Sequence, residues 1–350
     1  MHTNELVVDI HTIKMNTMKK LLFVFFFLTT ALYGQSKVGS TALPFLNIGI
    51  GARPMGMGGA FVATANDATA LYWNTAGIAH SNTNEVMFNH VKWFADIDMN
   101  WVGAMVRVGD MGTAGLSLTY LDYGKTEVTN DEEQEGTGEY YSASDMSLAL
   151  SYAYNLTDRF AIGMNFKYLR EQIWHSASSG FAVDIGTLFT SDIYGLRIGA
   201  SISNFGSDMK MDGKDLEFLH DIDPTINGNN DQIHGRFLTD SWPLPLTFRV
   251  GFAKDFMIGD MNRLTLAVDA VHPTDNSESL NLGTEYAFNE NIMLRAGYNS
   301  LLLDNSEQGL ALGFGLQHEF ATDFTVRVDY NYQDFGILEN TQQFSVGVRF

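Results

Sequence analysis

Residues that could carry chemistry are sparse in this 350-residue chain. Gly56-Met57-Gly58-Gly59 is glycine-rich, but it has neither the lysine of a P-loop nor the spacing of a dinucleotide-binding motif. The chain contains no H-E-x-x-H and no G-x-S-x-G sequence. His175-Ser176 is an adjacent pair without an orienting third group, so it gives little support to a serine hydrolase. The sequence therefore predicts a protein that is not an enzyme.

Two stretches of the chain are rich in acidic or oxygen-bearing residues. Asp131-Glu132-Glu133-Gln134-Glu135 is predicted to be a solvated external loop. The stretch 221–228 has the oxygen-ligand density of a calcium loop, but its glycine offset does not fit an EF-hand and no closing Glu follows. The absence of cysteine excludes a disulfide framework and a thiolate metal site. We predict no metal and no cofactor.

Composition indicates the class of protein. The formal net charge of -20 argues against nucleic-acid binding, which needs a basic surface. Charged residues make up 18% of the chain, below the roughly 25% of soluble domains, and aromatic residues make up 13%. Few charges and many aromatics are typical of a membrane barrel, in which only half of the residues of each strand face lipid.

The N-terminus has the features of a secretory signal. Lys19-Lys20 precede an apolar run over 21–28, and small and polar residues follow to Gly34. We predict that residues 1–34 comprise a start artefact, with Met15 or Met18 as the true start, and a cleaved signal peptide. A buried core helix is the alternative for the run, which is too short to span a membrane. Since no later segment would span as a helix, a closed barrel is the remaining way into a bilayer.

From about residue 84 the chain alternates with period two. Leu116, Leu118 and Tyr120 share one face, and Ser117 and Thr119 share the other. A helix cannot present such faces, because its period is 3.6. We count about 14 such strands, most of them near the length that a tilted membrane strand needs. They lie at 84–92, 99–109, 112–122, 143–154, 159–170, 180–190, 194–204, 246–256, 262–272, 279–288, 291–299, 308–318, 323–333 and 342–350.

The connections alternate between short turns and long loops, as in an outer-membrane barrel. A soluble sandwich would also alternate, but it would not need aromatic residues grouped at the strand ends, where two girdles would lie. The predicted fold is all-β, a transmembrane antiparallel β-barrel over 84–350 with an N-terminal lumen hatch. The predicted location is the outer membrane of a Gram-negative bacterium, with the lipid bilayer as a partner.

The predicted inward face is rich in glycine and in charges of both signs, among them Arg249, Asp269, Glu285, Arg295, Arg327 and Asp329. A water-filled lumen would solvate these charges, whereas a plug would pack against the glycines. The non-alternating stretch within 35–83 favours a plug, or hatch. We predict that Arg53, Asn66 and Asp67 pair with the inward charges. The other hatch candidates are Met55, Met57, Phe61, Tyr72, Trp73 and Asn74.

The stretch from Phe205 to Pro245 is too long for a simple connection. Its apolar residues would have to bury against something, which makes it either a lid over the barrel or a docking surface for another protein. The candidate docking residues are Leu216, Phe218, Leu219, Phe237 and Trp242.

The stretch GARPMGMGGAFVATANDATALYWNTAGIA, from Gly51, resembles the N-terminal signature of the PorV/PorQ family, relatives of the FadL-type 14-stranded barrels. The stretch 243–251 is similar to a second marker of that family. The ending over 346–350 is similar to the terminal aromatic signal of outer-membrane barrels. One departure is Thr75, where the family usually carries proline.

The resemblance implies a hatch inside the lumen and a role in type IX protein secretion. Such proteins bind the translocon, accept exported proteins and deliver them to a surface attachment complex. A FadL-like transporter of hydrophobic small molecules is the alternative, and an outer-membrane enzyme is a third reading. Transport predicts an apolar pocket between the hatch and the external loops, lined by Met55, Met57, Phe61, Leu71 and Trp73.

Overall fold

The computed structural model describes residues 38–95, 97–192, 194–222, 225, 232–303 and 306–350. The predicted start artefact and signal peptide, residues 1–34, lie outside this range. Among the described residues, no helix is both long enough and apolar enough to cross a membrane.

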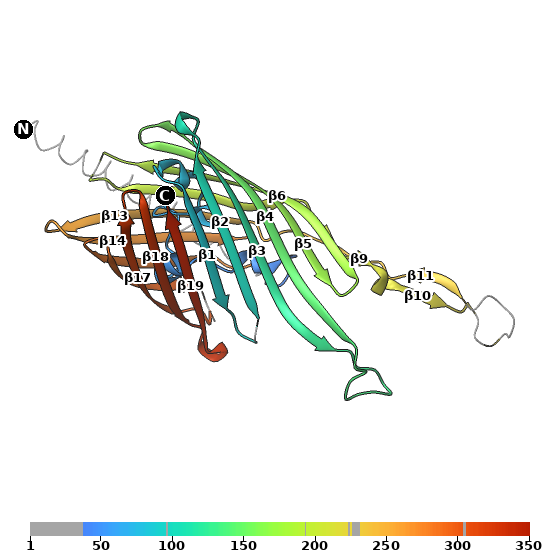
Figure 1. The fold of residues 1–350 in the computed structure, drawn as a ribbon. Helices are drawn as coiled ribbons and strands as arrows, with labels where there is room; N and C mark the ends of the chain where they lie inside the picture. The colour runs from blue at the N-terminus through green and yellow to red at the C-terminus, as the bar shows by residue number, and fades with distance from the viewer. Residues whose placement is uncertain (1–37, 96, 193, 223–224, 226–231, 304–305) are drawn as a thin grey trace, which may run out of the picture. The chain divides into compact units, whose positions relative to one another are not determined.

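Within the described residues, fourteen antiparallel strands close into a barrel (Figure 1). Each strand pairs with its neighbour in the chain, and the last strand pairs with the first, with Val86 opposite Val348. The strands are β1 (Glu85–Lys92), β2 (Asp98–Arg107), β3 (Thr113–Glu127), β4 (Tyr140–Thr157), β5 (Phe160–Ile173), β6 (Ser176–Thr190), β7 (Arg197–Gly206), β13 (Thr247–Ile258), β14 (Asn262–Pro273), β15 (Ser279–Phe288), β16 (Ile292–Leu301), β17 (Leu310–Ala321), β18 (Phe324–Asp334) and β19 (Asn340–Arg349). The predicted fold class is confirmed.

Side chains alternate across the barrel wall as their sequence pattern predicts. On β3, Ser117 and Thr119 are buried toward the lumen, whereas Leu116 and Tyr120 are exposed on the outer surface. Two connections contain short 3-10 helices. The helix η3 (Gly109–Met111) lies between β2 and β3, and the helix η5 (Gly336–Leu338) lies between β18 and β19. We call the end with η3 the short-turn end and the end with η5 the long-loop end.

Four strands extend further toward the long-loop end than predicted. β3 continues to Glu127, β4 starts at Tyr140, β5 continues to Ile173 and β6 starts at Ser176. These extensions are largely polar, and those of β3 and β4 are also largely exposed, so no apolar alternation reveals them. They pair through backbone hydrogen bonds, which do not depend on side-chain polarity.

The connection between β7 and β13 is not a plain loop. It contains β8 (Met209–Lys210), β9 (Asp212–Gly213), η4 (Lys214–Leu216), β10 (Glu217–His220), β11 (Ile233–Arg236) and β12 (Ser241–Trp242). β9 pairs with β6, β8 with β12, and β10 with β11. The β10–β11 hairpin extends past the ends of β5 and β6 (Figure 1).

Residues 38–83, which we call the N-terminal segment, form short helices instead of strands. These are η1 (Pro44–Asn47), α2 (Ala52–Gly56), α3 (Ala70–Trp73) and η2 (Thr75–His80). Gly51, Gly58 and Gly59 have φ values of 96°, 63° and 74°, which other residues rarely adopt. Thr75 is the first residue of η2, a position at which proline is also favoured. The departure from the family pattern therefore leaves this turn intact.

Candidate functional site

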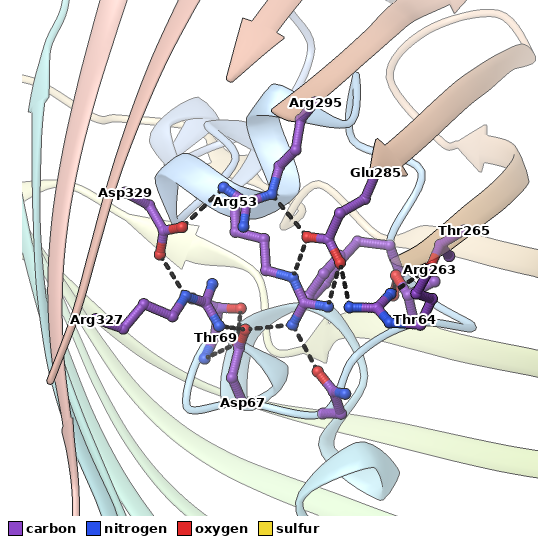
Figure 2. A network of polar contacts seen from close by, with 12 residues as sticks. Arg53, Thr64, Asp67, Thr69, Arg263, Thr265, Glu285, Arg295, Arg327 and Asp329 are labelled. Atoms are coloured by element: carbon purple, nitrogen blue, oxygen red, sulfur yellow. Dashed lines mark hydrogen bonds and ion pairs between the residues drawn. The ribbon is translucent and has the colours of Figure 1, made fainter. Parts of the chain in front are cut away.

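Six buried side chains of alternating charge form a closed ring where the N-terminal segment meets the barrel wall (Figure 2). Two come from the N-terminal segment, and four come from β15, β16 and β18. Three guanidinium groups alternate with three carboxylates, so the ring as a whole is neutral. Its members are Arg53, Asp67, Arg327, Asp329, Arg295 and Glu285.

Arg53 makes most of the contacts between the N-terminal segment and the other members of the ring. Its Nε and Nη2 donate to the two oxygens of Glu285, at 3.0 and 3.2 Å. Its Nη1 donates to Asp67 Oδ2 at 2.8 Å and to Asn66 Oδ1 at 2.6 Å. Arg53 and Asp67 thus pair with charges of the barrel wall, whereas Asn66 bonds Arg53 and not a strand residue.

The wall side completes the ring. Arg295 Nε donates to Glu285 at 2.7 Å, and its Nη1 donates to Asp329 at 2.7 Å. Arg327 Nε donates to Asp329 at 2.6 Å, and its Nη1 donates to Asp67 at 3.2 Å. Because each charge meets opposite charges on both sides, the desolvation cost of burial is offset all around the ring.

The ring sets the ionisation of its two N-terminal members. Burial favours the neutral acid at Asp67, but the guanidinium groups of Arg327 and Arg53 outweigh it and hold the pKa of Asp67 well below its usual range. Burial also opposes the charged form of Arg53, but the carboxylates of Glu285 and Asp67 outweigh it and raise the pKa of Arg53. Both groups are therefore charged at neutral pH.

Side chains of the wall also bind the backbone of the N-terminal segment. Asp269 accepts hydrogen bonds from the amides of Phe61 and Val62, at 2.7 and 2.8 Å. Asn165 donates to the carbonyl of Leu71 at 2.6 Å. Non-helical backbone inside a barrel needs such partners, since an unpaired buried amide is costly.

Further wall contacts come from β19 and β6. Ser345 accepts from the amide of Ala52 at 2.8 Å, and Gln343 donates to the carbonyl of Gly49 at 3.0 Å. Asn74, a predicted hatch residue, donates to the carbonyl of Thr187 at 3.0 Å. Alternation places Ser345 and Gln343 on the inward face, but nothing in the sequence marks them as partners of the segment.

Glycines of the wall lie directly against the backbone of the segment. A Cβ added to Gly297 would lie 2.2 Å from the backbone nitrogen of Gly58. One added to Gly163 would lie 2.4 Å from that of Ala76. Glycine at these positions lets the two backbones approach without a side chain between them.

The remaining hatch candidates lie in three different settings. Met57 and Phe61 are fully buried in the packed interior. Met55 and Trp73 line a pocket at the long-loop end, with a volume of about 470 Å³. Tyr72 packs edge-on against Trp73 and donates from its hydroxyl to the carbonyl of Leu46 at 2.9 Å. Of the pocket residues predicted for a transporter, Met55 and Trp73 line this pocket, whereas Leu71 is buried away from it.

The candidate docking residues are not buried, in contrast to what their apolar character predicts. Phe218 and Phe237 pack on each other, with ring centroids 4.7 Å apart, but they remain 36% and 61% exposed. Leu219 and Trp242 are also exposed, and Leu216 is partly buried. The described residues leave most of these side chains exposed, and the lid over the barrel and the docking surface both stay predictions.

The other motifs do not assemble into sites. Asp215 bonds both His175, through Nδ1 at 3.0 Å, and the hydroxyl of Ser176 at 3.1 Å. A catalytic serine would instead bond the histidine. Most of the stretch 221–228, weighed for calcium, lies outside the described residues. Among the described residues, no cluster of three or more His, Asp or Glu side chains forms a metal site.

Comparison with known families decides the assignment. The sequence model of the family described as "Type IX secretion system protein PorV" matches residues 32–274. The chain belongs to the PorV family. Membership places this PorV-family barrel in the outer membrane and supports the prediction that it has no enzymatic activity. A comparison with curated proteins finds no significant match.

Solved structures show the same fold as this PorV-family barrel. The Pseudomonas putida toluene transporter TodX aligns with a TM-score of 0.54 and 13% identity, over 86% of this chain and 97% of its own. The CymD monoaromatic hydrocarbon channel aligns with a TM-score of 0.52 and 12% identity, over the same shares. The Ralstonia pickettii toluene transporter TbuX gives 0.52 and 10%, also over 86% and 97%. These likenesses establish a shared barrel fold.

Proposed function

We propose that this PorV-family protein acts in type IX protein secretion as a non-enzymatic binding protein. In this role it binds the translocon and shuttles exported proteins to the surface attachment complex. The observation that carries the proposal is the contrast between an interior filled by the N-terminal segment and the apolar side chains left exposed in the connection between β7 and β13.

The filled interior fits a binding protein better than an open pore. The N-terminal segment is joined to the wall by the charge ring, by Asp269 and by direct backbone contact at Gly297. Opening the lumen would separate buried ion pairs, and leaving one buried charge without its partner costs roughly 3–5 kcal/mol. We therefore propose that the segment serves as a fixed hatch.

The exposed hairpin supplies a surface for partners. Phe218, Phe237, Leu219 and Trp242 present aromatic and aliphatic groups to solvent within one connection. Clustered exposed apolar groups of this kind mark interaction sites in proteins, and aromatic side chains contribute strongly to binding energy there. We propose that the translocon or an exported protein covers them.

Affinity purification from native membranes tests this role. A tagged wild-type protein should recover a large translocon or secreted proteins. The double variant Phe218→Ser/Phe237→Ser should assemble as a heat-modifiable barrel but lose these partners. The matched control Glu132→Ser/Glu133→Ser, in the exposed loop between β3 and β4, should keep them. Recovery of an isolated barrel with a bound hydrophobic small molecule from all three would contradict the proposal.

Transport of hydrophobic small molecules is the alternative, favoured by the pocket at the long-loop end. It requires the N-terminal segment to move. The chain has no cysteine, so Ala52→Cys/Ser345→Cys would introduce a single possible cross-link where the amide and hydroxyl of these residues are 2.8 Å apart. Oxidation should leave secretion intact if the hatch is fixed, and it should abolish uptake if transport is the function.

A further inference from the structure

The pocket at the long-loop end contains a buried cation without an ion-pair partner. Arg249, on β13, is 7% exposed and lines the pocket. Its guanidinium group lies over the ring of Trp73, 5.6 Å from the centroid, and hydrogen-bonds the hydroxyl of Tyr72, but it makes no ion pair among the described residues. Buried guanidinium groups are ordinarily paired, as all three in the charge ring are.

Neighbouring polar groups satisfy Arg249 only in part. The hydroxyl of Tyr72 bonds Arg249 and donates to the carbonyl of Leu46. Asp269, the inward carboxylate of the adjacent strand, accepts through Oδ2 from the amides of Phe61 and Val62, and its Oδ1 has no hydrogen-bond partner, so it forms no ion pair with Arg249. Asp275, at the rim, accepts from Thr41 and Asn47. Because a guanidinium group has five N–H donors, Arg249 keeps donors for an anion that enters the pocket.

The rest of the pocket is suited to an apolar body. Met55, Trp73, Trp93 and Phe335 contribute to its walls. Trp93 and Phe335 lie edge to face, with ring centroids 5.2 Å apart. A volume of about 470 Å³ lies within the usual range for small-molecule sites, which combine apolar walls with a few polar groups that fix orientation.

We propose that this pocket binds an organic carboxylate with an aromatic body, whose carboxylate pairs with Arg249 and whose ring packs between the aromatic walls. Planar bidentate pairing is the strongest interaction that a guanidinium group makes with such an anion. The proposal is independent of the secretion role, because it concerns a ligand site at the long-loop end and not the hairpin.

The test uses the full-length mature protein in lipid discs and equilibrium dialysis with two probes of nearly equal shape, 2-naphthoate and neutral 2-naphthamide. Wild type should bind 2-naphthoate saturably and the amide about tenfold or more weakly. Arg249→Gln should weaken 2-naphthoate by about tenfold or more and leave the amide unchanged, whereas Arg249→Lys should retain a preference for the anion.

The matched control is Arg197→Gln, on the neighbouring strand β7, because Arg197 faces inward but lines a different cavity at the short-turn end. It should bind 2-naphthoate like wild type. Equal binding of the two probes by wild type, no saturable binding, or undiminished binding of 2-naphthoate by Arg249→Gln would overturn the proposal. The comparison of probes on wild type needs no variant, so it stands even if Arg249→Gln fails to assemble.

Discussion

Arg53 and Glu285, 232 positions apart in the chain, form a two-contact ion pair inside the barrel. The pair joins α2 of the N-terminal segment to β15 of the wall, and Glu285 is also bonded by Arg295 and Arg263. One carboxylate thus holds three guanidinium groups. Removing either member of the pair would leave charges that water cannot reach.

We predict that Arg53→Gln destabilises the folded barrel by roughly 3–5 kcal/mol, because Glu285 and Asp67 would lose a buried counter-charge. Urea unfolding in lipid vesicles would measure the loss. The control is Arg159→Gln, which breaks the exposed pair with Asp192 and should cost less than about 1 kcal/mol. Equal costs for the two variants would show that the ring does not stabilise the fold.

The barrel could be predicted from the sequence because one face of each strand meets lipid. Alternation sets Leu116 and Tyr120 apart from Ser117 and Thr119, and the strand β15 has the predicted bounds, 279–288. The extensions of β3 to β6 could not be predicted, because they are largely polar on both faces and backbone pairing leaves no pattern in residue type.

The site was only partly predictable for a related reason. Charge and glycine content identified the inward residues and suggested Arg53 and Asp67 as partners. Which charge meets which depends on the path of the N-terminal segment, and that path is set by contacts such as Asp269 with Phe61 across 208 positions. Alternation identifies Arg249 as an inward charge, but its lack of an ion pair becomes visible only when every neighbour is placed.

Acid should act on the ring through Asp67. Its pKa is lower in the folded protein than the ordinary value of 3.8, so its ionisation stabilises the fold fully above about pH 4. That contribution is lost progressively as the pH falls from there toward the lowered pKa. We predict that Asp67 causes no change in the free energy of unfolding between pH 5 and 7, and a decline below pH 4.

The variant Asp67→Asn isolates this effect. It should be less stable than wild type at pH 7, and the difference should shrink below pH 4, because the unfolded wild-type chain takes up a proton at Asp67 there while the folded protein does not. Unfolding measured at intervals from pH 3 to 7 would show this convergence. A difference that stays constant over the whole range would mean that Asp67 is not the group that titrates.

The assignment of faces on β3 has its own test. Leu118 lies on the outer surface, so Leu118→Arg should place a charge against lipid and cost roughly 2–4 kcal/mol near the bilayer centre. Ser117→Arg points inward, where the nearest cavity, lined by Leu71 and Tyr72, holds only about 20 Å³. It should therefore displace the N-terminal segment and increase its cleavage by added protease, an effect that Leu118→Arg should not have.

Close backbone contact between wall and segment gives the last prediction. A methyl group at Gly297 would lie 2.2 Å from the nitrogen of Gly58 and 2.2 Å from the carbonyl carbon of Met57. Both neighbours are backbone atoms, so the backbone of the segment or of β16 would have to move. Gly297→Ala should destabilise the protein by about 1–3 kcal/mol through overpacking and make the segment more accessible to protease. Gly309→Ala is the matched control, because a methyl group there has no neighbour within 4 Å and should change neither property. If Gly297→Ala behaved like Gly309→Ala, the segment would not lie against β16, and the proposed fixed hatch would lose one of the contacts on which it depends.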